Sequence, residues 1–149
     1  MIEHVWTDAQ FDAMSWHDNH VHALRLVAGE HGAGDLVLDI DHIVEWIPDA
    51  SGFRFRVVPA WLTFRNVANL RLHLDFATPT AAFGPFSIED VERNGATRER
   101  HAALAWRIVF NWPDGDLAFD STGFVQRARG VPVVNDAQVL RPEQRGHHD

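Results

Sequence analysis

The sequence predicts an all-β domain, or a β-rich domain with one short N-terminal helix, in which an antiparallel meander of strands forms a sandwich or a partly closed barrel. Apolar and polar residues alternate along most of the chain, which is the period of a strand with one buried face. Gly, Pro, Asn and Asp cluster between the alternating runs, and no helical segment of about 10–15 residues separates them. A parallel α/β fold is therefore not expected.

The first element is expected to be a short helix within residues 3–15. Thr7 or Asp8 could cap this helix, because their side-chain oxygens accept hydrogen bonds from the free N–H groups of a first helical turn. Phe11 and Met14 would then face the interior of the domain.

After the helix, runs with two-residue periodicity predict about eight or nine short strands. The runs lie at residues 24–27, 36–46, 53–57, 62–64, 70–76, 104–110, 117–119 and 124–125. Turn residues separate them at 32–35, 48–52, 66–69 and 113–115, and the last turn is predicted to join residues 102–112 to 116–120 as a hairpin. Parity assigns Trp46, Leu72 and Trp106 to the apolar face, so we expect all three in the core.

Residues 1–149 are expected to form a single domain, because the chain has the length of one domain and no linker or internal repeat divides it. The segment 130–149 contains Pro132 and Pro142 and few periodic residues. We expect it to be an ordered strap that ends in a frayed tail near residues 145–149.

The same alternation places charged residues on the second face of the sheet. This predicted polar face comprises Asp39, Asp41, Glu45, Arg54, Arg56, Arg71, His73, Asp75 and Arg107. In one interpretation it is a solvated surface, in which the first two aspartates pair with Arg54, Arg56 or Arg71 on neighbouring strands. In the other interpretation it is a binding surface, with its carboxylates as the contacts to a partner.

The run from Ser15 to His22 concentrates the side chains that could hold a metal ion. The candidate ligands are His17, Asp18, His20, His22 and, from a neighbouring strand, Asp41. His20 and His22 point to the same side of a strand, and the other ligands would leave an open position on a divalent zinc or iron ion. The alternative is structural: His17 and Asp18 form a turn pair, and the other two imidazoles bond to backbone at the rim of the sheet. The cupin pattern, which also uses His-x-His, lacks its downstream Glu and its second motif here.

Composition restricts the classes of function. The formal net charge of −8 argues against nucleic-acid binding, because phosphate contacts need clustered cations, and it permits a basic protein partner. The absence of Lys, Tyr and Cys removes Schiff-base chemistry, tyrosine general acids and thiol nucleophiles. No apolar run is long enough to cross a bilayer and the first residues show no secretion signal, so we expect a cytoplasmic protein without membrane contact.

Two motifs give the chain a resemblance to a protein family. Ser15-Trp16-His17-Asp18 is followed by Val21 and an alternating strand, and Leu62-Thr63-Phe64-Arg65-Asn66-Val67 and Asn69-Leu70 come later. Over residues 15–76 the chain resembles small bacterial β-rich proteins that open with a Ser-x-His-Asp element. Some members of that group are regarded as immunity proteins of polymorphic toxin systems. The resemblance implies a binding protein encoded beside a toxin, it implies no enzyme, and it supplies no catalytic residues.

These observations lead to three hypotheses about function. The first is a small cytoplasmic protein-binding module, immunity-like, that occludes a basic partner and catalyses nothing. The second is a metal-dependent enzyme or metal sensor that uses His17, His20 and His22. The third is a barrel that holds a small apolar ligand in its interior. An unpaired strand edge could also pair across a two-fold axis and give a homodimer.

Overall fold

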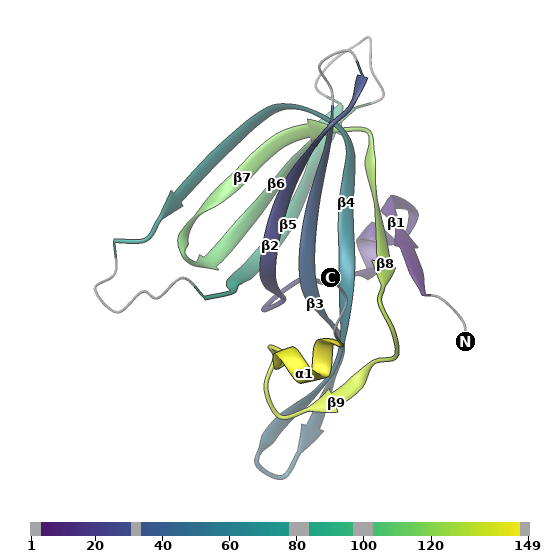
Figure 1. Cartoon of the computed structure of the whole chain (residues 1–149), viewed down its shortest axis with the longest axis vertical. Helices are drawn as coiled ribbons and strands as arrows, with labels where there is room; N and C mark the ends of the chain where they lie inside the picture. Colours follow the sequence, from purple (N-terminus) through teal and green to yellow (C-terminus); the bar gives the residue numbers. More distant parts are fainter. Residues whose placement is uncertain (1–3, 31–33, 78–83, 97–102, 147–149) are drawn as a thin grey trace.

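In a computed structural model that describes residues 4–30, 34–77, 84–96 and 103–146, nine strands form one antiparallel sheet (Figure 1). The strands are β1 (Val5–Thr7), β2 (His20–Ala28), β3 (Gly34–Asp49), β4 (Gly52–Asp75), β5 (Phe86–Ala96), β6 (Leu104–Trp112), β7 (Asp114–Ser121), β8 (Gly123–Ala128) and β9 (Val133–Asn135). A 3-10 helix, η1 (Asp8–Ala13), follows β1, and a short helix, α1 (Pro142–Arg145), follows β9. The predicted antiparallel, β-rich fold is confirmed. No helix among the described residues is long and apolar enough to span a membrane.

Hydrogen-bonded neighbours follow the order β1-β8-β4-β3-β2-β5-β6-β7, and β7 also pairs with the second half of β4. β4 pairs with β8 over residues 60–65 and with β7 over residues 68–75, so β4 and the β7–β8 segment run side by side as one long ribbon. The ribbon bends in the middle, where β4 arches over the top of the molecule in Figure 1. The bend brings β5, β6 and β7 across from β2, β3 and β8, and the core lies between these two groups.

Two asparagines produce the bend in β4. Asn66 and Asn69 have positive φ angles of 52° and 54°, a conformation that Asn adopts more readily than most residues. Their side chains bond to the facing segment, with Asn66 Nδ2 3.0 Å from Thr122 Oγ1 and Asn69 Nδ2 2.8 Å from Asp120 Oδ2. The predicted chain reversal at residues 66–69 is therefore wrong, because these residues bend one continuous strand.

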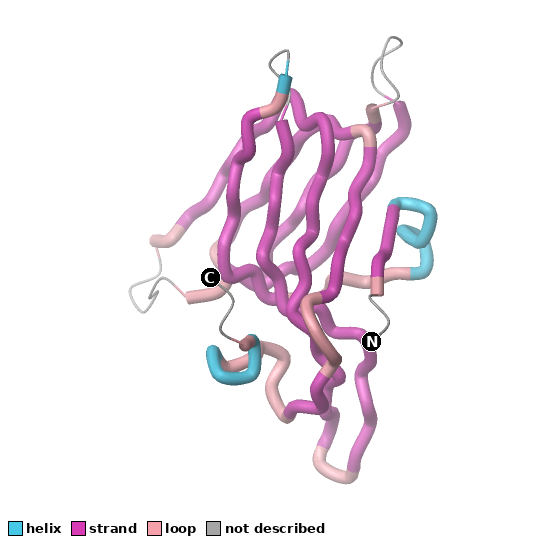
Figure 2. The backbone as a smooth tube through the Cα atoms, turned by 45° about the vertical axis from the view of Figure 1, so that its right-hand side comes forward, coloured by secondary structure: helices cyan, strands magenta, loops and turns pink. Residues whose placement is uncertain are grey.

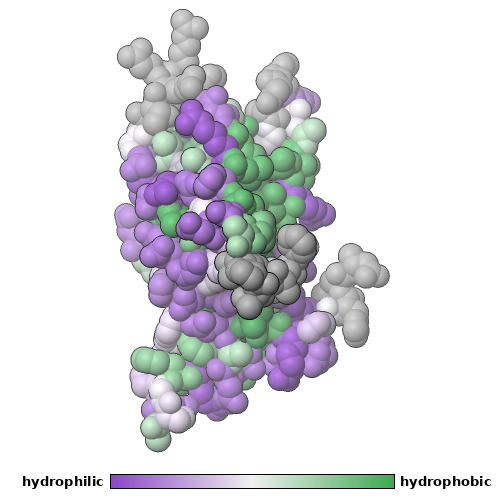
Figure 3. All heavy atoms as spheres, turned by 90° about the vertical axis from the view of Figure 1, so that its left-hand side faces the viewer, coloured by the Kyte–Doolittle hydropathy of each residue, from purple (hydrophilic) through white to green (hydrophobic). Residues whose placement is uncertain are grey.

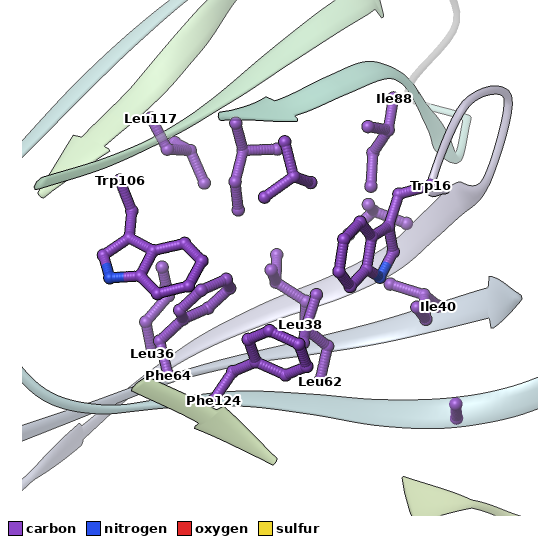
Figure 4. Close-up of a cluster of buried hydrophobic side chains, with 14 of the residues drawn as sticks. Trp16, Leu36, Leu38, Ile40, Leu62, Phe64, Ile88, Trp106, Leu117 and Phe124 are labelled. Atoms are coloured by element: carbon purple, nitrogen blue, oxygen red, sulfur yellow. The ribbon is translucent and has the colours of Figure 1, made fainter. Parts of the chain in front are cut away.

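Apolar side chains from both groups of strands meet in the core. Figure 4 shows Trp106, Leu117 and Ile88 on one side and Phe64, Phe124 and the leucines of β3 and β4 on the other. Trp106 is 1% exposed, as predicted, and its ring meets that of Phe64 edge to face with centroids 5.1 Å apart. These side chains pack together in the interior, where the third hypothesis would place an apolar ligand.

The predicted burial of Leu72 and Trp46 is wrong. Leu72 lies opposite the buried Leu117, so it points to the core side, yet it is 50% exposed. Among the described strands, only β7 pairs with residues 68–75 of β4, so this part of β4 is an edge of the sheet. Apolar surface gathers on the left-hand side of the molecule in Figure 1, where the second half of β4 lies and which faces the viewer in Figure 3. Trp46 is 38% exposed because it lies beyond the core, on the projecting hairpin of β3 and β4.

The predictions for the N-terminal helix cap and for the β6–β7 hairpin are confirmed. Thr7 caps η1 in a capping box with Gln10, and Phe11 and Met14 pack against the core. Gly115 lies in the tight β6–β7 hairpin with φ of 146°, and a Cβ there would come within 1.9 Å of the carbonyl oxygen of His73. This close approach requires glycine.

The C-terminal segment packs beside the projecting β3–β4 hairpin (Figures 1 and 2). β9 pairs with residues 55–57 of β4, and Leu140 is buried in a small second core with Ile43, Phe55 and Val57. Arg145, which the sequence assigns to a frayed tail, is instead only 11% exposed at its side chain and bonds to carboxylates of β3. Residues 147–149 of that predicted tail lie outside the described residues.

Candidate functional site

The candidate site begins in the turn that precedes β2. Ser15 Oγ accepts from the N–H of His17 at 3.2 Å, and the N–H of Asn19 donates to the carbonyl of Trp16 at 2.9 Å. Asp18 has a positive φ of 62°, which Asp tolerates, and its N–H donates to the carbonyl of Ile88 at 2.7 Å. These bonds attach the turn to β5, so its polar side chains have fixed directions.

His17 and Asp18 form a hydrogen-bonded group of their own. His17 Nδ1–H donates to the carbonyl of Glu89 at 3.0 Å, and its ring stacks on Trp46 with centroids 6.2 Å apart. Its Nε2 lies 3.6 Å from Asp18 Oδ2, and the side chain is 55% exposed. Asp18 accepts from Asn111 at 3.0 Å and from Gln138 at 2.9 Å, so it connects β6 and the C-terminal segment to the turn.

Asn19 and His42 form a buried polar pair. Asn19 Nδ2–H donates to His42 Nδ1 at 2.7 Å, and Asn19 Oδ1 accepts from the N–H of Ile43 at 3.1 Å. His42 must be neutral to accept this bond. Burial, and to a smaller extent the nearby His4, lowers the pKa of His42 to about 4. The pair therefore holds the turn before β2 to β3 as a neutral hydrogen-bonded unit.

Asp41 is the centre of the second group. It is fully buried, and its Oδ2 accepts from His22 Nε2–H at 2.7 Å and from the N–H of Leu140 at 2.8 Å. Its Oδ1 bonds to Arg145. His20 lies nearby with its Nδ1 buried and without a hydrogen-bond partner among the described residues. Burial lowers the pKa of His20, although the charge of Asp41 opposes this effect.

Asp39 extends the charged cluster on the same strand. Arg129 and Arg145 both bond to its Oδ1. Two carboxylates therefore meet two guanidinium groups, and the planar Arg145 bridges Asp39 and Asp41. The predicted pairing of these aspartates with Arg54, Arg56 or Arg71 is wrong, because the C-terminal segment supplies their partners.

The arrangement does not assemble the predicted metal centre. Nowhere in the described parts of the chain do three His, Asp or Glu side chains converge in a way that could hold a metal ion. His22 Nε2 and Asp41 are committed to each other, whereas His17 and Asp18 belong to a separate hydrogen-bonded group. The histidines and carboxylates instead fix the turn, β3 and the C-terminal segment relative to one another.

The other residues of the predicted polar face lie in separate places. Near the projecting hairpin, Arg56 Nε is 3.2 Å from Glu45 and Arg54 Nε is 3.1 Å from Asp136. On β6, Arg107 Nε lies 2.7 Å from Asp116, and this hydrogen bond raises the pKa of the guanidinium. The remaining members, all exposed on the second half of β4, are Arg71, His73 and Asp75.

Sequence reasoning missed an aromatic surface on the hairpin. Trp46 lies opposite Phe55, and Pro48 lies opposite Phe53, so all four side chains share one face. Phe53 is 51% exposed, and the Trp46 ring lies 5.7 Å from the Phe53 ring and 5.0 Å from the Phe55 ring. The apolar residues that alternate on either side of the turn indicate this surface, but the same alternation also fits a buried sheet face.

Comparison with known protein families, with curated proteins and with solved structures gives no match.

Proposed function

We propose that this chain is a small cytoplasmic protein-binding module, of the immunity-like kind, that occludes a basic partner protein and performs no chemistry of its own. The observation that carries the proposal is the exposed aromatic face of the β3–β4 hairpin. This hairpin projects beyond the other strands, where a partner can reach it (Figure 2).

The aromatic face has the composition of a binding anchor. Trp46 and Phe53 are both more than one-third exposed and pack edge to face with each other. Large aromatic side chains of this kind contribute much of the energy of protein interfaces, because a partner removes a large apolar area from water. Trp46 is also held in place by Phe55 and His17, so little side-chain freedom is lost on binding.

The charge of the chain favours a basic partner. A formal net charge of −8 attracts a cationic protein and speeds its encounter. Asp39 and Asp41 are unsuitable as contacts because the C-terminal segment covers them. Glu45 remains exposed on the opposite face of the hairpin, where Arg56 partly neutralises it. The metal-dependent alternative loses support because His17 and His22, two of the three imidazoles that it requires, make internal hydrogen bonds and converge with no third ligand among the described residues.

Co-expression with the product of a toxin gene encoded beside this one tests the proposal. The wild-type chain should relieve the toxicity and copurify with the toxin. Trp46→Ala should lose the protection, whereas Leu72→Ala, a matched truncation of an exposed apolar side chain elsewhere on the sheet, should retain it. A toxin that remains lethal beside the correctly folded wild-type chain, and forms no complex with it, would contradict the proposal.

A further inference from the structure

The aromatic face of the hairpin continues into an acidic pocket. His17 connects the two, because its ring stacks on Trp46 and also lines the pocket. The pocket has a volume of about 400 Å³ and is lined by His17, Glu89, Asp90, Glu92, Arg107 and Val109. An apolar anchor and a negatively charged recess therefore form one continuous surface.

The pocket keeps uncompensated negative charge. Arg107, its only arginine, is bonded to Asp116 at 2.7 Å and lies 3.8 Å from Glu92, so its charge is already balanced. Among the described residues, neither Glu89 nor Asp90 takes part in an ion pair, and both are exposed. Asp90 Oδ1 accepts only the neighbouring N–H of Val91, at 2.9 Å.

The chain itself covers half of the hairpin's aromatic side. The inner part is occupied by Leu140, an aliphatic side chain from the bent segment between β9 and α1, which packs on Phe55. The outer part, with Trp46 and Phe53, is left open among the described residues. The contact of Leu140 with Phe55 shows that an aliphatic side chain fits this aromatic surface.

We propose that this continuous surface docks an extended, basic segment of the partner protein, with an apolar side chain on Trp46 and Phe53 and an adjacent arginine or lysine in the pocket. This inference rests on the proposed function and names the recognition chemistry that it would use. Complementary charge favours this occupant: Glu89 and Asp90 lack cations, and a guanidinium can bond to two carboxylates at once. A second copy of this chain is disfavoured because it carries the same net charge of −8.

Titration of the full chain with a synthetic peptide tests the inference. The probe is an acetylated, amidated hexapeptide in which arginine and leucine alternate, and the comparison peptide has glutamate in place of each arginine. The readout is the NMR signal of the Trp46 indole N–H, assigned by its loss in Trp46→Ala. Trp16 and Trp106, whose indoles bond to Gln126 and to the carbonyl of Ser121, provide buried internal references.

The arginine peptide should shift the Trp46 signal in a saturable way, and the glutamate peptide should not. The double variant Glu89→Gln with Asp90→Asn should weaken binding by roughly threefold to tenfold, as two exposed ion pairs would. Its matched control, Glu30→Gln with Asp35→Asn at the opposite end of β2 and β3, changes the net charge equally and should bind like the wild type. Added salt should weaken the wild-type interaction.

Three results would overturn the inference: an unmoved Trp46 signal, equal binding of the glutamate peptide, or equal weakening by the two double variants. The proposed function would survive each of them if the toxin still bound, because another surface would then carry the interaction. Failure of toxin protection together with a positive peptide titration would instead reject the proposed function and leave the docking surface established.

Discussion

Acidification should destabilise this fold through His42. In the folded chain His42 is buried and accepts a hydrogen bond from Asn19, and burial lowers its pKa from 6.5 to about 4. The unfolded chain exposes the same imidazole, which then binds a proton below pH 6.5. Because the unfolded state takes up a proton that the folded state excludes, stability falls as the pH decreases from 6.5 towards 4. Above that window His42 is neutral in both states and has no effect on the pH dependence.

The size of this effect follows from the interval between the two pKa values. From 6.5 down to about 4, at about 1.4 kcal/mol per pH unit, the loss of unfolding free energy reaches about 3 kcal/mol. A domain of this size is typically stable by about 5–15 kcal/mol, so the loss is measurable. His20, whose pKa is also lowered by burial, adds a change in the same direction.

Urea unfolding at several pH values between 7.5 and 4, followed by tryptophan fluorescence, measures this loss. The comparison is His42→Asn, whose side-chain oxygen can still accept from Asn19 but which does not titrate. The carboxylates and His20 contribute equally to both proteins, so the difference between the two pH profiles isolates His42. The wild type should lose about 3 kcal/mol more than the variant by pH 4. Parallel profiles, or an NMR titration that places the pKa of His42 near 6.5, would refute the reasoning.

Two further substitutions test other parts of the structure. Asp41→Ala should lower the free energy of unfolding by about 3 kcal/mol and speed hydrogen exchange at the Leu140 amide, because it removes a buried carboxylate that binds Arg145 and this N–H. The control Glu45→Gln breaks only an exposed ion pair and should lower the free energy of unfolding by less than about 1 kcal/mol. Equal losses in the two variants would show that Asp41 does not anchor the C-terminal segment. Gly115→Ala should cost about 2 kcal/mol in urea unfolding, because its Cβ would collide with the His73 carbonyl, and an unchanged midpoint would show that the hairpin adjusts freely.

Two-residue periodicity predicted which side of the sheet a residue faces better than it predicted burial. Leu26 and Leu72 lie opposite the fully buried Leu36 and Leu117, so their predicted side is correct. Both are at least half exposed, because burial also depends on whether another strand or layer covers the edge. No local pattern carries that information.

The strand β5 escaped prediction because a bulge interrupts its period. The buried side chains of β5 include Ile88 and Val91, which are three residues apart rather than two. A register shift between Ile88 and Asp90 allows both to face the core. An interrupted period of this kind is indistinguishable from a loop in the sequence alone.

The candidate site was predictable in its membership but not in its connections. The sequence singled out His17, His22 and Asp41, and the structure places each of them in a hydrogen-bond network. The partners of Asp41 and its neighbour Asp39 come from Arg129 and Arg145, which are separated from them by 90 to 106 positions. Local spacing cannot show such contacts, and it therefore left the metal site open as an alternative to the favoured structural role.

The central claim is that the imidazoles of this region serve the fold and leave recognition to the exposed hairpin. The most direct test is an NMR measurement of the ring nitrogens of His17, His20, His22 and His42 during a titration with zinc at pH 7. The account predicts that the ring nitrogens of His22 and His42 keep the shifts of hydrogen-bonded, metal-free imidazoles and that no stoichiometric zinc complex forms. Saturable binding of one zinc ion that shifts His20 and His22 together would contradict it.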